Sequence, residues 1–148
     1  MSTSKATLYD TDFYGWTQQQ AAVLRDEKWM LLDAENLAEE IETLGRSERD
    51  SIENRLQTLL THLLKWRYDR ATEPRRGWRI TIRNARKGIA KKAQFSLKDY
   101  PEQYLAEAYG DAREDAADET GIPLDTFPEA CPWTITQVLD KDFWPEVK

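Results

Sequence analysis

The sequence predicts an all-α protein: a compact bundle of about five helices, followed by an irregular C-terminal tail rich in Pro and Trp. Apolar residues recur at helical spacing through most of the chain, and few of its six glycines and six prolines fall inside those periodic segments. With 148 residues and 40% apolar composition, the chain can bury roughly two thirds of its unfolded surface. We therefore expect a single helical domain over residues 1–148.

The first two predicted helices occupy the N-terminal third of the chain. Asp10 can cap the first, whose apolar positions recur from residue 13 and fade near residue 28. Asp33 opens the second, which reaches Gly45, a natural position for the left-handed residue that closes a helix. The apolar face of this second helix consists of Leu37, Ile41 and Leu44.

A third, longer helix is predicted over residues 47–66. Ser47 and Asp50 resemble a capping box at its start. Its apolar arc is wide enough for a helix at the centre of the core, so we expect it to be the most buried of the five. The arc consists of Ile52, Leu56, Leu59, Leu60, Leu63 and Trp66.

A basic amphipathic helix follows an exposed connection. Residues 69–77 contain Pro74 and five charged residues, which is typical of a solvent-exposed connection. A narrow apolar stripe then runs from Trp78 to Ile89 at a period of 3.6 residues, with Arg and Lys beside and behind it.

The fifth helix and the tail have clear boundary signals. Pro101 stands near the first helical position, and Gly121 ends the helix that begins there. Four of the six prolines lie in the tail beyond it. Within this tail, Thr134 and Gln137 could cap one short helix.

The charges of the chain fall into three blocks. Residues 65–92 contain eleven Lys or Arg and two acids, a net charge of +9 in a chain whose total is −6. Residues 33–53 contain eight carboxylates and two arginines, and residues 99–119 contain eight carboxylates and one arginine. This layout produces either a basic surface that meets an anion or a cationic helix that lies between anionic ones. The sequence leaves both open.

Composition excludes several classes of protein. The single cysteine, Cys131, rules out an internal disulfide. No apolar run at the start could serve as a signal segment, and no stretch approaches the roughly 18 apolar residues of a membrane span. We expect a soluble, bacterial-type cytoplasmic protein with no membrane partner. Its pI near 4.9 makes the whole chain a poor nucleic-acid binder, because long-range attraction to phosphate depends on net charge.

His62 is the only histidine, and therefore the first candidate for acid, base or metal chemistry. It stands at the edge of the apolar arc, and Leu59 occupies the position where a di-iron helix bundle has Glu. Cys131 has no base beside it in sequence, and no phosphate loop or nucleotide fingerprint is present. We expect a hydrogen-bonded boundary histidine, no catalytic residue, no metal and no cofactor.

Two carboxylates fall on an apolar helix face. By helical spacing, Asp115 and Glu119 share the face of the fifth helix that is otherwise mostly alanine. A lone buried charge costs several kcal/mol, so each of them should be paired or neutral. Arg83 and Arg86 of the basic helix are the predicted partners.

Several strings in the chain resemble a known family. They begin with Leu8-Tyr9-Asp10 and continue through Glu39-Glu40-Ile41-Glu42, His62-Leu63-Leu64-Lys65-Trp66 and Glu119-Thr120 to Pro132-Trp133. In this order they resemble the bacterial family called domain of unknown function 29, which is frequent and often multi-copy in cyanobacteria. The resemblance covers about residues 8–145. It implies an all-helical domain, and it carries no agreed activity and no catalytic residues.

The resemblance suggests one candidate site, and the charge pattern suggests another. The first is a shared polar centre made of Glu40, His62, Arg86, Arg113 and Glu119, to which helical spacing adds Asp115 on the same helix face as Glu119. The second is a basic patch made of Arg75, Arg76, Arg79, Arg83, Lys87 and Lys91.

We interpret the protein as a non-enzymatic module that binds another macromolecule, an accessory or antitoxin-like protein by analogy. An acidic protein surface is the favoured partner, and a homodimer is left open. One alternative is a nucleic-acid-binding protein that uses the basic helix over residues 75–92. Another is a metal-dependent enzyme centred on Glu40, His62 and Glu119.

Overall fold

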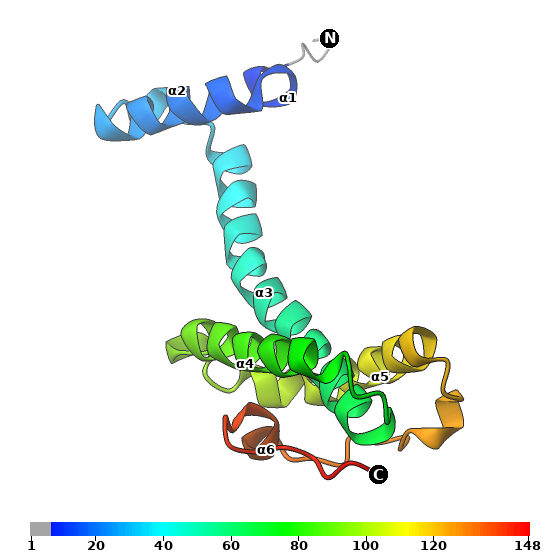
Figure 1. Ribbon diagram of the computed structural model, residues 1–148. Helices are drawn as coiled ribbons and strands as arrows, with labels where there is room; N and C mark the ends of the chain where they lie inside the picture. Colours follow the sequence, from blue (N-terminus) through cyan, green and yellow to red (C-terminus); the bar gives the residue numbers. More distant parts are fainter. Residues whose placement is uncertain (1–6) are drawn as a thin grey trace. The chain divides into compact units, whose positions relative to one another are not determined.

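The computed structural model describes residues 7–148, which are 74% helical and contain no strand. This confirms the predicted all-α class. Contacts divide the chain into two compact units, Met1–Gly45 and Arg46–Lys148. The α-helices in the described residues, drawn in Figure 1, are α1 (Leu8–Thr11), α2 (Phe13–Arg25), α3 (Ala34–Tyr68), α4 (Arg75–Lys92), α5 (Tyr100–Thr120) and α6 (Ile135–Leu139).

The chain begins with two helices where one was predicted. Asp12, with φ −146° and ψ 80°, interrupts the helical backbone and caps α2, and its side chain accepts a hydrogen bond from the Gly15 amide at 3.0 Å. Asp10 belongs instead to the capping box of Thr7 at the start of α1. The prediction that Asp10 caps the long first helix was therefore wrong by two residues, since either Asp satisfies the local capping signal.

Asp33 links the end of the first connection to α2 within the first unit. Its carboxylate accepts hydrogen bonds from Trp16 Nε1 and Asn36 Nδ2, both at 2.9 Å. Its backbone amide donates to Gln20 Oε1 at 2.8 Å. The bonds from Asn36 and Trp16 lower the pKa of Asp33, because they stabilise its charged form.

Helix α3 runs unbroken through the predicted boundary at Gly45. Among the residues that the structure describes, only Gly121 is a glycine with positive φ, so Gly45 does not adopt the left-handed conformation. A glycine inside a helix costs about 1 kcal/mol relative to alanine, which the continuing backbone hydrogen bonds offset. Ser47 therefore starts no new helix, and the expected apolar face of the second helix is largely open, with Ile41 64% and Leu44 68% exposed.

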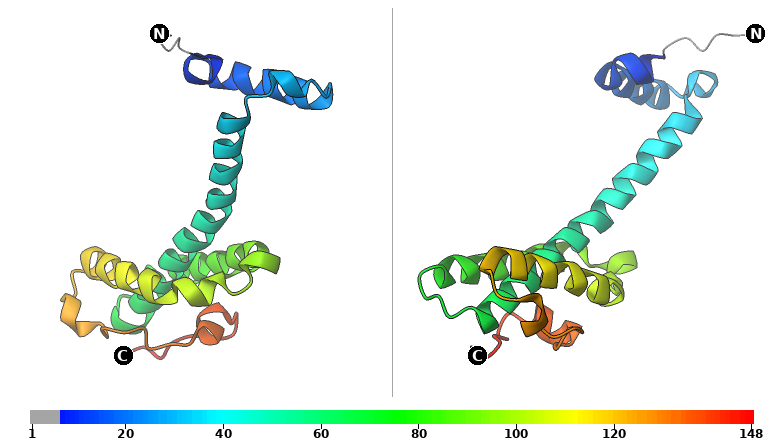
Figure 2. Two further views of the ribbon diagram at one scale, coloured as in Figure 1. Left: turned by 180° about the vertical axis from the view of Figure 1, so that it is seen from behind. Right: turned by 90° about the vertical axis from the view of Figure 1, so that its right-hand side faces the viewer.

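The second unit is built around the C-terminal half of α3. Helices α4 and α5 lie on either side of it. The C-terminal segment, residues 121–148, runs below α4 and α5 in the views of Figure 1 and Figure 2, near the C-terminal end of α3. The predicted arc is confirmed as the central core face, with Ile52 and every leucine of the arc 0% exposed, while Trp66 at its end is only partly buried. This core also contains Ile82, Ala85 and Ile89 of α4, Ala108, Tyr109, Ala112 and Ala116 of α5, and Phe127, Trp133 and Val138.

The predicted boundaries of the later helices are largely confirmed. Helix α5 ends at Gly121, which has a left-handed φ of 77°. Thr134 and Gln137 form the capping box of α6. Helix α4 begins at Arg75, inside the segment predicted as a connection, because Pro74 can occupy the position before the first helical residue without losing a hydrogen bond.

Candidate functional site: a basic pocket on α4

The predicted basic patch is mostly at the surface. Arg76, Arg79, Arg83, Lys87 and Lys91 are exposed on α4. None of them has a carboxylate oxygen within 4.0 Å in the part of the chain that the structure describes. Their apolar neighbours Ile82 and Ile89 are fully buried and anchor the helix on the core. The exposed cations are thus held on a fixed helix.

Arg75 differs from the rest of the predicted patch because its guanidinium is engaged. Its Nη2 donates to the backbone oxygens of Trp66 at 3.0 Å and Asp69 at 2.6 Å. The guanidinium carbon lies 4.9 Å from the centroid of the Trp66 ring. These contacts join the end of α3 to the start of α4, so Arg75 has a structural role.

A pocket of about 590 Å³ lies beside α4, and the C-terminal segment supplies its other lining. Its lining contains five cationic side chains and one acidic side chain, Asp142. The α4 members recur every three or four residues and therefore share one helix face. The lining residues are Arg79, Arg83, Arg86, Lys87 and Ala90 of α4, with Leu139, Lys141, Asp142 and Trp144 of the C-terminal segment.

Arg86 is the buried member of this pocket, with 5% of its surface exposed. Its Nε donates to the Val138 carbonyl at 2.8 Å, and its Nη2 donates to the Phe143 carbonyl at 2.9 Å. Its Nη1 is buried and has no hydrogen-bond partner. Burial lowers the pKa of Arg86 while the charge of Asp140 raises it, and the guanidinium stays protonated at physiological pH.

Trp144 forms an aromatic wall of the pocket. Its ring centroid lies 4.7 Å from that of Trp66. The guanidinium carbons of Arg79 and Arg86 lie 5.0 and 5.4 Å from its centroid, within the range of a cation–π contact. Arg79 also lies 5.5 Å from the Trp66 ring, so two indoles orient an otherwise exposed arginine.

Three members of the predicted polar centre have separate partners. Glu40 belongs to the first unit and accepts a hydrogen bond from the Tyr9 hydroxyl, which raises the pKa of Tyr9 to about 12. Arg86 binds the C-terminal segment, as described above. Arg113 Nε donates to the Phe127 carbonyl at 3.1 Å. Both arginines thus bind backbone carbonyls of the C-terminal segment.

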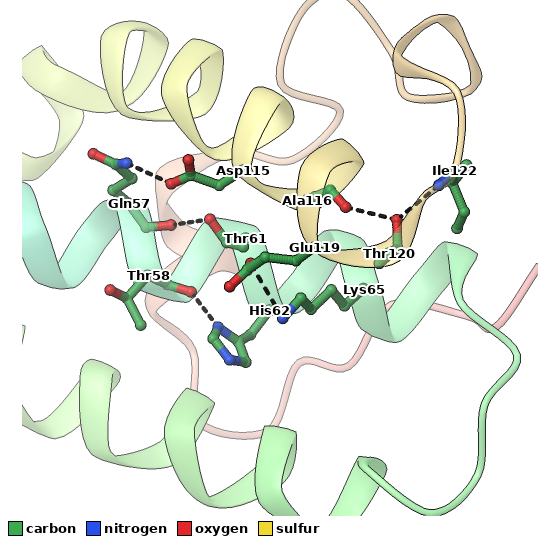
Figure 3. A network of polar contacts seen from close by, with 10 residues as sticks. All are labelled: Gln57, Thr58, Thr61, His62, Lys65, Asp115, Ala116, Glu119, Thr120 and Ile122. Atoms are coloured by element: carbon green, nitrogen blue, oxygen red, sulfur yellow. Dashed lines mark hydrogen bonds and ion pairs between the residues drawn. The ribbon is translucent and has the colours of Figure 1, made fainter.

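Of the other three members, Asp115 and Glu119 lie on α5 and reach toward α3, whereas His62 projects from the side of α3 that faces α4 (Figure 3). Asp115 Oδ2 accepts from Gln57 Nε2 at 2.6 Å. Glu119 Oε2 lies 3.2 Å from Lys65 Nζ, and its side chain is 52% exposed.

The prediction that arginines of the basic helix pair with these two carboxylates was wrong. Both partners lie on α3, because α3 separates α5 from α4 (Figure 3). Arg86 faces the C-terminal segment, and Arg83 lines the pocket.

His62 has the geometry of a hydrogen-bonded boundary histidine. Its Nδ1 lies 2.8 Å from the Thr58 carbonyl oxygen, and since a carbonyl only accepts, Nδ1 carries the hydrogen. Burial lowers the pKa of His62, an effect that the Thr58 bond and the charge of Glu119 oppose. The neutral ring is therefore favoured near neutral pH.

Cys131 does not have the environment of an activated nucleophile. Burial raises the pKa of the Cys131 thiol, whose Sγ donates to the Trp133 carbonyl at 3.4 Å. A raised thiol pKa is the opposite of what a nucleophile needs. Within residues 7–148, no group of three or more His, Cys, Asp or Glu side chains is placed to hold a metal ion.

The chain as a whole matches one family. The family model "Domain of unknown function DUF29" covers residues 8–144. The chain belongs to this family. A search of the curated proteins and a search of the solved structures each found no match. The DUF29 match extends from the first residue of α1 to Trp144, and so includes the whole lining of the pocket.

Sequence reasoning missed the C-terminal half of the DUF29 pocket. Leu139, Lys141, Asp142 and Trp144 belong to a segment predicted only as irregular and aromatic. Their place depends on the two carbonyl bonds of Arg86, which no local pattern reveals. The α4 half was visible as a basic helix face.

No helix among the described residues is both long and apolar enough to cross a membrane.

Proposed function

We propose that this DUF29 protein is a non-enzymatic, cytoplasmic binding module that holds an acidic segment of a protein partner on the exposed cationic face of α4. The observation that carries the proposal is the unpaired state of this face. Arg76, Arg79, Arg83, Lys87 and Lys91 are exposed, and none has a carboxylate within 4.0 Å among the described residues. Fixed, unpaired cations of this kind attract an acidic partner and set its orientation.

The charge of the whole chain favours an acidic protein over nucleic acid. The net charge is −6, and residues 99–119, mostly α5 of the same unit, contain eight carboxylates. A duplex carries charge along its whole length, so it meets this repulsion as well as the attraction of α4. A short acidic segment can lie on α4 alone.

The test compares two probes and two charge-reversal variants. The probes are a polyglutamate peptide and a duplex DNA, each titrated at low and physiological salt. The variant Lys87→Glu/Lys91→Glu reverses two cations of the face. The control Lys28→Glu/Lys98→Glu makes the same change in net charge at exposed lysines elsewhere.

We expect polyglutamate binding that weakens with salt and falls at least about 10-fold in the α4 variant, with little change in the control. Duplex DNA should bind no more tightly than about 1 µM at physiological salt. If both variants lose polyglutamate binding equally, the attraction is non-specific and the proposal fails. Tight, steeply salt-dependent DNA binding would instead select the nucleic-acid alternative.

A further inference from the structure

Arg86 carries a buried positive charge that has no carboxylate in direct contact among the described residues, although the charge of Asp140 acts on it from farther away. It is 5% exposed, and its two hydrogen bonds go to neutral carbonyls. No carboxylate oxygen lies within 4.0 Å of it in the described part of the chain, and its Nη1 has no partner. Burial still lowers the pKa of Arg86 despite Asp140, so an anion in the adjoining pocket would offset part of the cost of burying this charge.

The rest of the pocket lining is also mostly cationic. Arg79, Arg83, Lys87 and Lys141 line the same cavity as Arg86, and Asp142 is the only acidic residue in the lining. Like charges around a shared cavity repel one another when it is empty and converge on an anion when it is filled. A ligand with more than one negative charge would therefore be attracted more strongly to this lining than a singly charged one.

From these observations we infer that the pocket binds a phosphoryl group attached to an apolar organic moiety. A phosphate monoester is close to a dianion at neutral pH, and it offers three acceptor oxygens to arginine forks. The volume of about 590 Å³ is in the usual range for small-ligand sites. Trp144, Leu139 and Ala90 provide an apolar wall for the organic part.

The inference rests on the proposed function, since three of the pocket's cations also belong to the cationic face of α4. It names the chemical group that the partner would place there. The same group occurs on small organic phosphates and on phosphorylated side chains of proteins. The experiment therefore includes a probe for each source.

The probes are phenyl phosphate, benzoate and a short phosphotyrosine peptide, titrated calorimetrically into the full chain at about pH 7.5, where the phosphate is dianionic. We expect phenyl phosphate to bind at least about 10-fold more tightly than benzoate, because a dianion with three acceptor oxygens can form charge-assisted hydrogen bonds with more of the cationic side chains. The Arg86 guanidinium resonances should shift on binding. A phosphotyrosine peptide that binds more tightly than phenyl phosphate would identify a protein as the source, and equal affinity would identify a small molecule.

Two variants of α4 separate the pocket from the general charge of the helix. Arg83→Gln/Lys87→Gln removes two pocket cations, whereas Arg76→Gln/Lys91→Gln removes two exposed cations outside the lining. Phenyl phosphate affinity should fall at least about 10-fold in the first variant and stay within about 2-fold in the second.

Equal losses in the two variants, equal affinity for benzoate, or no binding of either phosphate would overturn the inference. The proposed function fails on a different result, namely that the wild-type chain shows no specific binding of polyglutamate. Polyglutamate should also weaken in Arg76→Gln/Lys91→Gln, because it covers the whole cationic face. The two results can thus fail independently.

Discussion

The ion pair between Glu119 and Lys65 gives a prediction whose size depends on burial. The Lys65 side chain is 12% exposed and that of Glu119 is 52% exposed, with 3.2 Å between Nζ and Oε2. A pair of this kind that is open on one side contributes roughly 0.2–1 kcal/mol, whereas breaking a fully buried pair costs roughly 3–5 kcal/mol. Since solvent reaches the carboxylate, we expect Glu119→Gln to lower the free energy of unfolding by about 1 kcal/mol or less.

A double-mutant cycle isolates the pair from the other contacts of Lys65. Glu119→Gln, Lys65→Met and the double variant are compared by urea denaturation followed by circular dichroism. Asp118→Asn, at an exposed neighbouring carboxylate on α5, is the matched control for the loss of one charge. A coupling energy above about 2 kcal/mol would show that the pair behaves as a buried one and would refute the reasoning from exposure.

Three further changes test the core, a helix end and the histidine. Leu63→Ala, at a side chain that is 0% exposed, should cost roughly 2–5 kcal/mol in urea denaturation. A loss below about 1 kcal/mol would place that face at the surface. Gly121→Ala should cost about 1–2 kcal/mol, because φ is 77° and alanine is strained there. For Gly45→Ala in a helical segment we expect no loss, so it serves as its control. Burial lowers the pKa of His62 below its usual 6.5, so the unfolded chain binds the proton more readily. The stability from neutral His62 is therefore complete above pH 6.5 and decreases as the pH falls through that value. His62→Gln should reduce this acid sensitivity in thermal unfolding, and an unchanged profile would contradict it.

The parts of the fold that the sequence predicted have strong local causes. Pro101 marks the start of α5 because the proline ring fixes φ near its helical value. Gly121 marks the end because glycine readily adopts the left-handed conformation. The arc from Ile52 to Leu63 is buried because so wide an apolar face must pack against other helices to be removed from water. In these segments, local preference and tertiary packing agree.

The errors occurred where two local signals competed or where tertiary contacts decided. Asp10 and Asp12 are equivalent as caps in sequence, and only the backbone at Asp12 separates them. Gly45 permits a helix end without requiring one. Glu119 pairs with Lys65 and not with an arginine of α4 because α3 lies between α4 and α5. The charge pattern of the sequence does not reveal this position of α3. Only the α4 half of the pocket was predicted, because Trp144 and the rest of the C-terminal lining are placed by tertiary contacts.

The two bonds from Arg86 to Val138 and Phe143 make the pocket conditional on the end of the chain. Residues 139–144 supply four of the lining side chains, so the cavity exists only while this segment is docked on α4. Docking and occupancy are then thermodynamically linked: any molecule that fills the cavity stabilises the docked segment by the same free energy that docking adds to binding. An occupant would therefore slow proteolysis and amide exchange in the last residues of the chain, while the α3 core exchanges as before.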